Sequence, residues 1–252
     1  GLSVVVVTEN DMDLAERWRD ELLDRAWAGR EAFVYKIEPL QESLARAKAV
    51  TDGPAILLDH YDNAASGGTM DTTAVLKGII DAGLEDVAAF AIHDPKAVQE
   101  MIAAGVGAEV TVSLGGKYDM PSIGRTGEPL QATGRVRLIS DGRYRNLGPA
   151  SKGILMDMGP TAVLDTGKVE IVVISKHQEP NDLGCFLSLG IDPTRKRYLM
   201  LKSRIHYRAG FKPIAKQVIE CAGVGVCTSD YSMLDFKRVR RPIYPLDIIN
   251  EP

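Results

Sequence analysis

The chain has 252 residues, 45% hydrophobic and 25% charged, which suits one large globular domain or two small ones. Its formal net charge of −4 argues against a nucleic-acid partner, because neutralising phosphates requires a basic surface. No apolar run reaches the roughly 18 residues that span a bilayer, so no membrane partner is expected.

The three cysteines, Cys185, Cys221 and Cys227, lack the close spacing of a zinc knuckle or disulfide framework. The cysteine content therefore indicates a protein of the reducing cytoplasm. The start of the chain lacks the basic region and cleavage site of a signal peptide. Because the chain opens directly on an apolar strand pattern, we expect a piece of a longer protein.

The first 119 residues alternate between strand and helix signals. Strands are expected at 3–8, 33–37, 55–58, 87–92 and 110–114, and the apolar runs at 3–8 and 55–58 indicate strands that are buried. Helices are expected at 11–28, capped by Asp11, then after Pro39, at 71–82 and after Asp94-Pro95. This alternation predicts βαβ units and a mostly parallel sheet.

The pattern changes to β signals in the segment 120–175. Strands are expected at 130–139, 144–147, 154–156, 161–164 and 169–174, separated by turn pairs such as Asp141-Gly142. From 176 onward, we expect helices at 182–189 and after His206, strands at 197–202 and 217–221, and an extended tail at 242–252. The predicted fold is α/β: a mostly parallel sheet with flanking helices, from 1–119 and 176–252, plus an antiparallel β subdomain at 120–175.

The first candidate site follows the strand at 55–58. It comprises Asp59, His60, Asp62 and Asn63, followed by the Gly67-Gly68 loop. Ligands of open α/β sheets bind at the carboxyl ends of strands, and a glycine-rich loop can offer N–H groups to an anion or oxyanion. The side chains include metal-ligand types, but His60 and Asp62, two residues apart, converge poorly. The alternative is a polar turn in which Asp71 caps the next helix.

The second candidate site is the run from Lys202 to Arg208, which follows the strand near 198–201. Lys202, Ser203, His206 and Arg208 could together bind a carboxylate or phosphate and supply a proton donor. The alternative is surface charge with one structural histidine. Parallel neighbours place their carboxyl ends together, so we expect both candidate loops on the same edge of one sheet, facing a common groove.

Other motifs carry less information. Leu114-Gly115-Gly116-Lys117 lacks the spacing of a Walker phosphate loop, and His93 fits a structural role. The strand end at 175–178 could face the same cleft as the two loops. Neither G-x-S-x-G nor H-E-x-x-H occurs, so no serine hydrolase or common zinc peptidase is encoded locally.

Several of these runs, taken together and in order, resemble the microcystinase C family. The matching segments are Asp59-x-x-Asp62-Asn63 with Gly67, Asp71-x-Thr73, Leu114-Gly115-Gly116-Lys117, Thr133-Gly134-Arg135-Val136, Gly190-Ile191-Asp192-Pro193, Lys202-Ser203-x-x-His206-Tyr207-Arg208, and Arg241-Pro242-Ile243-Tyr244-Pro245-Leu246-Asp247. The loop departs from the family pattern at Ala64-Ala65-Ser66 and Gly68-Thr69-Met70.

The resemblance implies the C-terminal domain of a zinc-dependent peptidase about twice this length. The implied metal ligands, an Asp and two His with a nearby Glu, belong to an N-terminal domain, so zinc is expected for the full-length protein and no ligand is assigned here. Expected partners are that N-terminal domain, a small peptide or amide substrate, and a second copy of the chain. Catalytic residues are not assigned, and the isolated chain is expected to be inactive.

In this interpretation, the residues of both loops line the cleft. Asp59, Asp62 and Asn63 would orient substrate or neighbouring groups. Lys202, His206 and Arg208 would bind a substrate carboxylate or steady an oxyanion. A surface normally covered by the partner domain should leave Tyr61, Met70 or Tyr207 partly uncovered. The competing hypothesis is a non-catalytic module that binds a small anion at Gly67-Gly68.

Overall fold

The computed structural model describes residues 2–36 and 38–249. The chain divides into two compact units, and each is described by itself. Unit 1 comprises Gly1–Lys36 and Arg238–Pro252, and unit 2 comprises Ile37–Lys237. Among the described residues, no helix combines the length and apolar character needed to cross a membrane.

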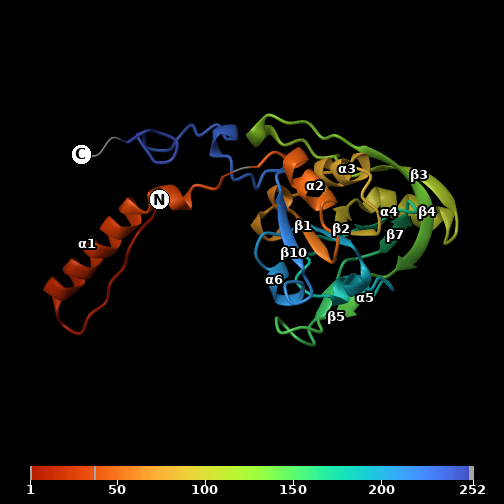
Figure 1. The fold of residues 1–252 in the computed structure, drawn as a ribbon, viewed down its shortest axis with the longest axis horizontal. Helices are drawn as coiled ribbons and strands as arrows, with labels where there is room; N and C mark the ends of the chain where they lie inside the picture. Colours follow the sequence, from red (N-terminus) through yellow and green to blue (C-terminus); the bar gives the residue numbers. More distant parts are fainter. Residues whose placement is uncertain (1, 37, 250–252) are drawn as a thin grey trace. The chain divides into compact units, whose positions relative to one another are not determined.

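Unit 2 is built on an eight-stranded sheet of order β10-β1-β9-β2-β8-β7-β4-β3 (Figure 1). The strands are β1 (Ala55–Asp59), β2 (Val87–His93), β3 (Glu109–Leu114), β4 (Leu130–Ser140), β7 (Thr161–Asp165), β8 (Val169–Ile174), β9 (Tyr198–Leu201) and β10 (Gln217–Cys221). The pairs from β10 to β8 are parallel, and those from β8 to β3 are antiparallel. The expected α/β class with a mostly parallel sheet is confirmed.

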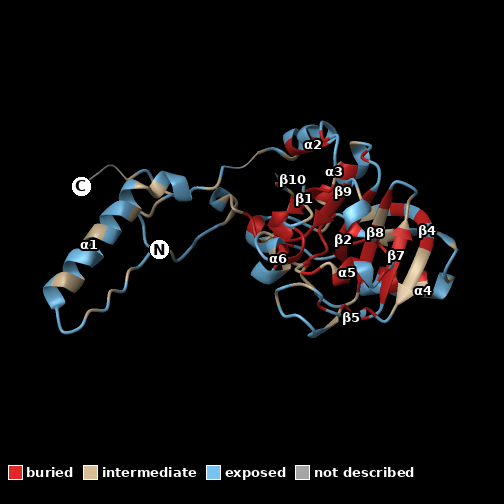
Figure 2. Cartoon of the chain, turned by 60° about the horizontal axis from the view of Figure 1, so that its bottom comes forward, coloured by how far each residue is buried: buried red, intermediate tan, exposed pale blue. Residues whose placement is uncertain are grey.

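Helices cover both faces of this sheet, which explains why β1, β2 and β9 are buried along their whole length. One face packs against α2 (Leu40–Lys48), α3 (Ala74–Asp81) and α4 (Pro95–Ala104). The other packs against α5 (Gly184–Leu187) and α6 (Tyr207–Gly210). Figure 2 shows the buried strands between these layers. The apolar β-branched runs therefore become central strands because both faces find cover.

The antiparallel strands of the segment 120–175 belong to two different sheets. β4, β7 and β8 continue the main sheet, whereas β5 (Arg143–Arg145) and β6 (Leu155–Asp157) form a separate two-stranded sheet. Short 3₁₀ helices lie at Arg30–Phe33, His60–Asp62, Ala64–Ser66, Pro121–Ile123, Pro193–Arg195 and Tyr231–Met233.

Unit 1 contains α1 (Met12–Ala28), where the expected helix is confirmed: the Asp11 side chain accepts from the Leu14 N–H at 2.9 Å. The strand predicted at 3–8 is wrong, since this segment forms no strand and Val5 and Val7 are 87% and 88% exposed. The strand predicted at 33–37 is also wrong through residue 36, and residue 37 lies outside the described residues. An apolar run becomes a strand only beside a pairing partner, and the described residues supply none here.

Candidate functional site

The two loops singled out in the sequence meet at one edge of the sheet. β1 and β9 are parallel neighbours, Asp59 ends β1, and Lys202 follows β9. The Lys202 Nζ donates to Asp59 Oδ2 at 2.7 Å and to Asp62 Oδ2 at 2.9 Å. The prediction that both loops share an edge is therefore confirmed, whereas the common groove that they were expected to face stays a prediction.

Lys202 is fully buried, and its ammonium group is surrounded by acceptors. Besides the two carboxylates, it donates to the Thr72 carbonyl at 2.7 Å and lies 3.2 Å from Thr72 Oγ1. Burial opposes the charge, but Asp59 and Asp62 outweigh it and raise the pKa of Lys202 above its ordinary value. An ammonium has only three hydrogens, so the group is saturated and faces the protein interior.

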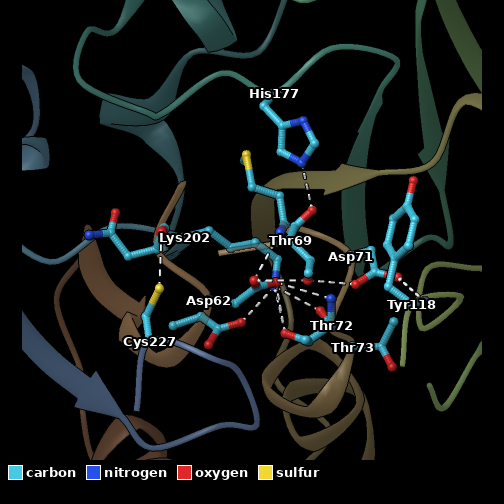
Figure 3. Close-up of polar contacts among 12 residues, drawn as sticks. Asp62, Thr69, Asp71, Thr72, Thr73, Tyr118, His177, Lys202 and Cys227 are labelled. Atoms are coloured by element: carbon cyan, nitrogen blue, oxygen red, sulfur yellow. Dashed lines mark hydrogen bonds and ion pairs between the residues drawn. The ribbon is translucent and has the colours of Figure 1, made fainter. Parts of the chain in front are cut away.

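The carboxylate of Asp62 accepts hydrogen bonds from several groups of the loop that follows it (Figure 3). Its Oδ1 accepts from the Met70 N–H at 2.9 Å and lies 3.2 Å from Thr69 Oγ1. Its Oδ2 accepts from the Thr72 N–H at 3.0 Å and hydroxyl at 2.9 Å. Burial alone would raise the pKa of Asp62, but Lys202 and these donors hold the pKa below its ordinary value. The side chain is thus a fixed anion that ties residues 69–72 to the end of β1.

Asp59 has a different environment from Asp62. Its Oδ1 is buried and has no hydrogen-bond partner among the described residues. Burial raises the pKa of Asp59 to about 6, against the lowering effect of Lys202 and with a further increase from Asp62. Asp59 is therefore the carboxylate of this network that takes up a proton most readily.

His60 lies beneath the surface, with 2% exposure, and its Nδ1 is 3.9 Å from Glu220 Oε2. Burial, with the nearby Arg204 charge, lowers the pKa of His60 to about 4. The ring is consequently neutral near pH 7.

The Gly67-Gly68 loop uses its own N–H groups. Gly67 donates to the Ala64 carbonyl at 3.1 Å and Gly68 to the Asn63 carbonyl at 2.9 Å, while the Asn63 amide donates to Ser66 Oγ at 2.8 Å. These two N–H groups are already bonded within the loop, which speaks against the anion-binding hypothesis.

Asp71 does not cap α3, contrary to the polar-turn alternative, because Thr73 holds that position. Its side chain instead accepts from the Thr69 hydroxyl at 2.7 Å and from the N–H groups of Lys117 at 2.7 Å and Tyr118 at 3.1 Å. Asp71 therefore fixes the connection between β3 and β4 beside the first loop.

The Gly115-Gly116-Lys117 motif also serves local structure. The Gly115 N–H donates to Asp94 Oδ2 at 2.9 Å, and Lys117 Nζ donates to the same oxygen at 2.5 Å. A Cβ on Gly115 would lie 2.3 Å from the Asp71 carbonyl oxygen, so glycine is required. The motif wraps around two carboxylates and is not a phosphate loop.

The second loop depends on Glu179, which is not among the residues predicted from the sequence. Glu179 accepts from Ser203 Oγ at 2.8 Å through one oxygen and lies 2.7 Å from His206 Nδ1 through the other. The His206 side chain remains 62% exposed, and Arg208 is exposed as well. The only sequence signal for Glu179 was its position immediately after the strand end at 175–178. This loop, unlike Lys202, presents polar side chains to solvent.

A cavity of about 310 Å³ adjoins the first loop at the start of α3. Its lining includes Asp71, Thr72, Tyr118, Met120 and Val224. Thr72 belongs both to this wall and to the Lys202 network. The network therefore fixes one side of a concave, partly apolar site.

A stack of histidines stands near the same loop. The His177 Nε2 lies 2.9 Å from the Thr69 carbonyl oxygen, and the His177 and His93 rings stack with centroids 3.9 Å apart. Burial, and then the neighbouring His177, lower the pKa of His93. His93 is thus largely structural, as its sequence context indicates.

The residues of this site do not fit a metal centre. Within 2–36 and 38–249, no group of three His, Cys, Asp or Glu side chains is placed to hold an ion. The Lys202 ammonium pairs with both Asp59 and Asp62, so a cationic group of the protein already lies between these two carboxylates.

The apolar side chains expected to be uncovered are buried. Tyr61, Met70 and Tyr207 are 3%, 0% and 4% exposed, so that prediction is wrong. Met70 and Tyr207 belong to the core on one face of the sheet, and Tyr61 lies beside the His60 ring. The chain folds these loops inward, so the side chains meet the core rather than an interface.

Comparison with known proteins agrees with this fold. The family model described as MlrC C-terminus matches residues 57–238. Microcystinase C of a Sphingomonas species is 28% identical over 251 residues, which is 98% of this chain and 47% of that protein. A crystal structure from Mesorhizobium sp. BNC1, which carries a provisional metallopeptidase name, shares 25% identity with a TM-score of 0.79, over 94% of this chain and 47% of its own. The chain thus spans about half the length of these relatives. It belongs to the MlrC C-terminus family.

Proposed function

We propose that this chain is the substrate-facing part of a metal-dependent amide or peptide hydrolase. The family match over residues 57–238 carries the proposal, because it contains both loops and the cavity. Two relatives, one named Microcystinase C and the other given a provisional metallopeptidase name, point to the same class of reaction.

The metal, which we propose to be zinc, belongs to the half of the longer protein that this chain does not match. The described side chains offer no set of three ligands, and the Lys202 ammonium pairs with both Asp59 and Asp62. The partner in this proposal is an N-terminal metal-binding domain of the same protein. Three buried free thiols support a cytoplasmic location.

The two loops have different roles in this proposal. Asp59, Asp62, Asn63 and Lys202 are positioning residues, since their polar groups are buried and bond within the loops. His206 and Arg208 are exposed and would bind the free carboxylate of a small peptide. Glu179 would hold the His206 ring in place.

The activity test compares the full-length protein with the 252-residue chain on a panel of di- and tripeptides. We expect the full-length protein to hydrolyse peptides, to lose activity on chelation and to regain it with added zinc. The isolated chain should stay inactive with or without zinc. A full-length protein that cleaves no peptide, or whose cleavage is unaffected by chelation, would overturn the proposal.

A second test addresses the carboxylate contact in the full-length protein. The double variant His206→Gln with Arg208→Gln should raise KM about 10-fold or more for free-acid peptides and change KM little for their C-terminal amides. Arg195→Gln is the matched control, because Arg195 is also exposed but lies on a different connection. Equal effects on acids and amides would remove these residues from carboxylate binding.

A further inference from the structure

Unit 1 exposes an unusual amount of apolar surface. Val5, Val7 and Phe33 are 87%, 88% and 75% exposed. α1 is a 17-residue helix without a single buried residue, and Figure 2 shows it without buried colouring. Globular proteins rarely leave such a segment uncovered, so something covers it in the working protein.

The exposed segment from Ser3 to Thr8 has the composition of a central strand. It contains four consecutive valines, which place apolar β-branched side chains on both faces. The described residues give it no strand partner, so its backbone N–H and C=O groups are available for pairing. It is followed by a helix capped by Asp11, as in a βα unit.

The helix itself carries an apolar stripe. Leu14, Trp18 and Leu22 recur at intervals of four residues and so share one face of α1. Trp18 and Leu22 are each 43% exposed. A helix of this kind normally packs its stripe on a sheet, and the neighbouring valine strand belongs to such a sheet.

The C-terminal tail packs against α1. The Tyr244 ring packs edge-on against Trp27 with centroids 6.3 Å apart, and the Arg30 guanidinium lies 4.5 Å from the Trp27 ring centroid. Both ends of the chain therefore contribute to the same small unit.

The comparisons indicate what covers this unit. The family model spans 57–238 and so falls almost wholly within unit 2, Ile37–Lys237. The match to Microcystinase C covers 98% of the chain, so it extends into unit 1, yet it accounts for only 47% of that protein. Unit 1 is thus shared with a relative twice as long but lies outside the C-terminal family model. These boundaries associate unit 1 with the other half of the longer protein.

We infer that residues 2–36 and 238–249 complete a second domain whose remaining part is the half this chain does not match. In that domain, Ser3–Thr8 pairs with the open edge of a mostly parallel sheet, and α1 covers one face of it. The inference rests on the proposal that this chain is one half of a longer protein. It does not depend on hydrolase activity or on the identity of a metal.

The test is amide hydrogen exchange, measured by mass spectrometry on the full-length protein and on the 252-residue chain at several concentrations. We expect the amides of Val4–Val7 to exchange at least about 100-fold more slowly in the full-length protein. Peptides from β1 and β2 serve as internal references and should exchange equally in both. No activity is measured, so this result is separate from the test of the proposed function.

A pair of variants gives a second readout. Val5→Asp with Val7→Asp should abolish the protection of residues 4–7 and of α1 in the full-length protein, while β1 and β2 stay protected. Val106→Asp is the control, because Val106 is 65% exposed on unit 2 and should change neither. Equal exchange of residues 4–7 in both proteins would overturn the inference. So would protection that grows with concentration in the 252-residue chain, which would assign the surface to a second copy, or a gene that encodes no further domain.

Discussion

Lys202 shows how a charged side chain can be fully buried when every group around its charge is an acceptor within the protein. Its ammonium compensates two carboxylates that are almost fully buried with it. Removing the ammonium would leave the two carboxylates as uncompensated buried charges, which costs more than the two ion pairs contribute. The three side chains are therefore best regarded as one structural unit that closes two loops.

The first prediction follows from that unit. Lys202→Met, which keeps the length of the side chain, should lower the free energy of unfolding by about 3 kcal/mol or more at pH 7. Urea unfolding followed by circular dichroism measures the change. Lys212→Met is the control, since Lys212 is exposed, and it should change stability by less than about 0.5 kcal/mol. Similar losses for both variants would show that the buried network contributes little.

His60 makes the folding stability of the chain depend on pH. Its pKa is lowered from 6.5 to about 4 in the folded chain, so between these values the unfolded chain binds more protons. The contribution of His60 is complete above pH 6.5 and is lost as the pH falls toward 4. Asp59, whose pKa is raised from 3.8 to about 6, has the opposite effect over much of this window.

We therefore predict the effect of removing His60 alone. In His60→Gln, the stability lost between pH 7 and pH 4.5 should be smaller than in the wild type by about 2 kcal/mol. Urea titrations at the two pH values measure it. An unchanged difference in His60→Gln would mean that His60 is not held neutral by burial.

At the scale of elements, the connection from β1 to α3 depends on two adjacent glycines for different reasons. Gly67 has a φ of 90° and open space where a Cβ would stand. A Cβ on Gly68 would lie 2.6 Å from the Asp62 carbonyl carbon and 2.8 Å from the Asn63 carbonyl oxygen. Glycine is needed at position 67 because the backbone there has a positive φ. Glycine is needed at position 68 because neighbouring backbone atoms leave no room for a Cβ.

This difference gives a matched pair of variants. Gly67→Ala should cost about 1 kcal/mol from the left-handed backbone. Gly68→Ala should cost about 3 kcal/mol, because backbone on both sides must move and the contacts of Asp62 move with it. Thermal and urea unfolding measure both. If Gly67→Ala is the more damaging, the loop is not packed as described.

At the scale of the whole molecule, the chain's metal content can be predicted from its donor set. After dialysis, the 252-residue chain should hold well under one zinc per chain, whereas the full-length protein should retain stoichiometric metal. Elemental analysis of both preparations measures this. One tightly held zinc in the 252-residue chain would contradict the prediction and require ligands that the described residues do not bring together.

The class of fold, and the edge of the sheet at which the candidate site lies, could be predicted from the amino-acid sequence. The runs at 55–58 and 198–201 are apolar throughout because their strands are buried on both faces, and this places Asp59 and Lys202 at neighbouring carboxyl ends. The caps Asp11 and Asp94 were readable because capping is a local contact across three residues.

Which polar side chains face inward depends on contacts between segments that lie far apart in the sequence. Lys202 lies 143 residues from Asp59, and His206 lies 27 residues from Glu179, so neither pairing follows from local spacing. The burial of Tyr61 and Tyr207 likewise depends on how the loops fold against the rest of unit 2. The valine run at 3–8 also shows that a local sequence pattern does not by itself determine the structure. Its pattern specifies a strand, but a strand forms only where another segment supplies its hydrogen bonds.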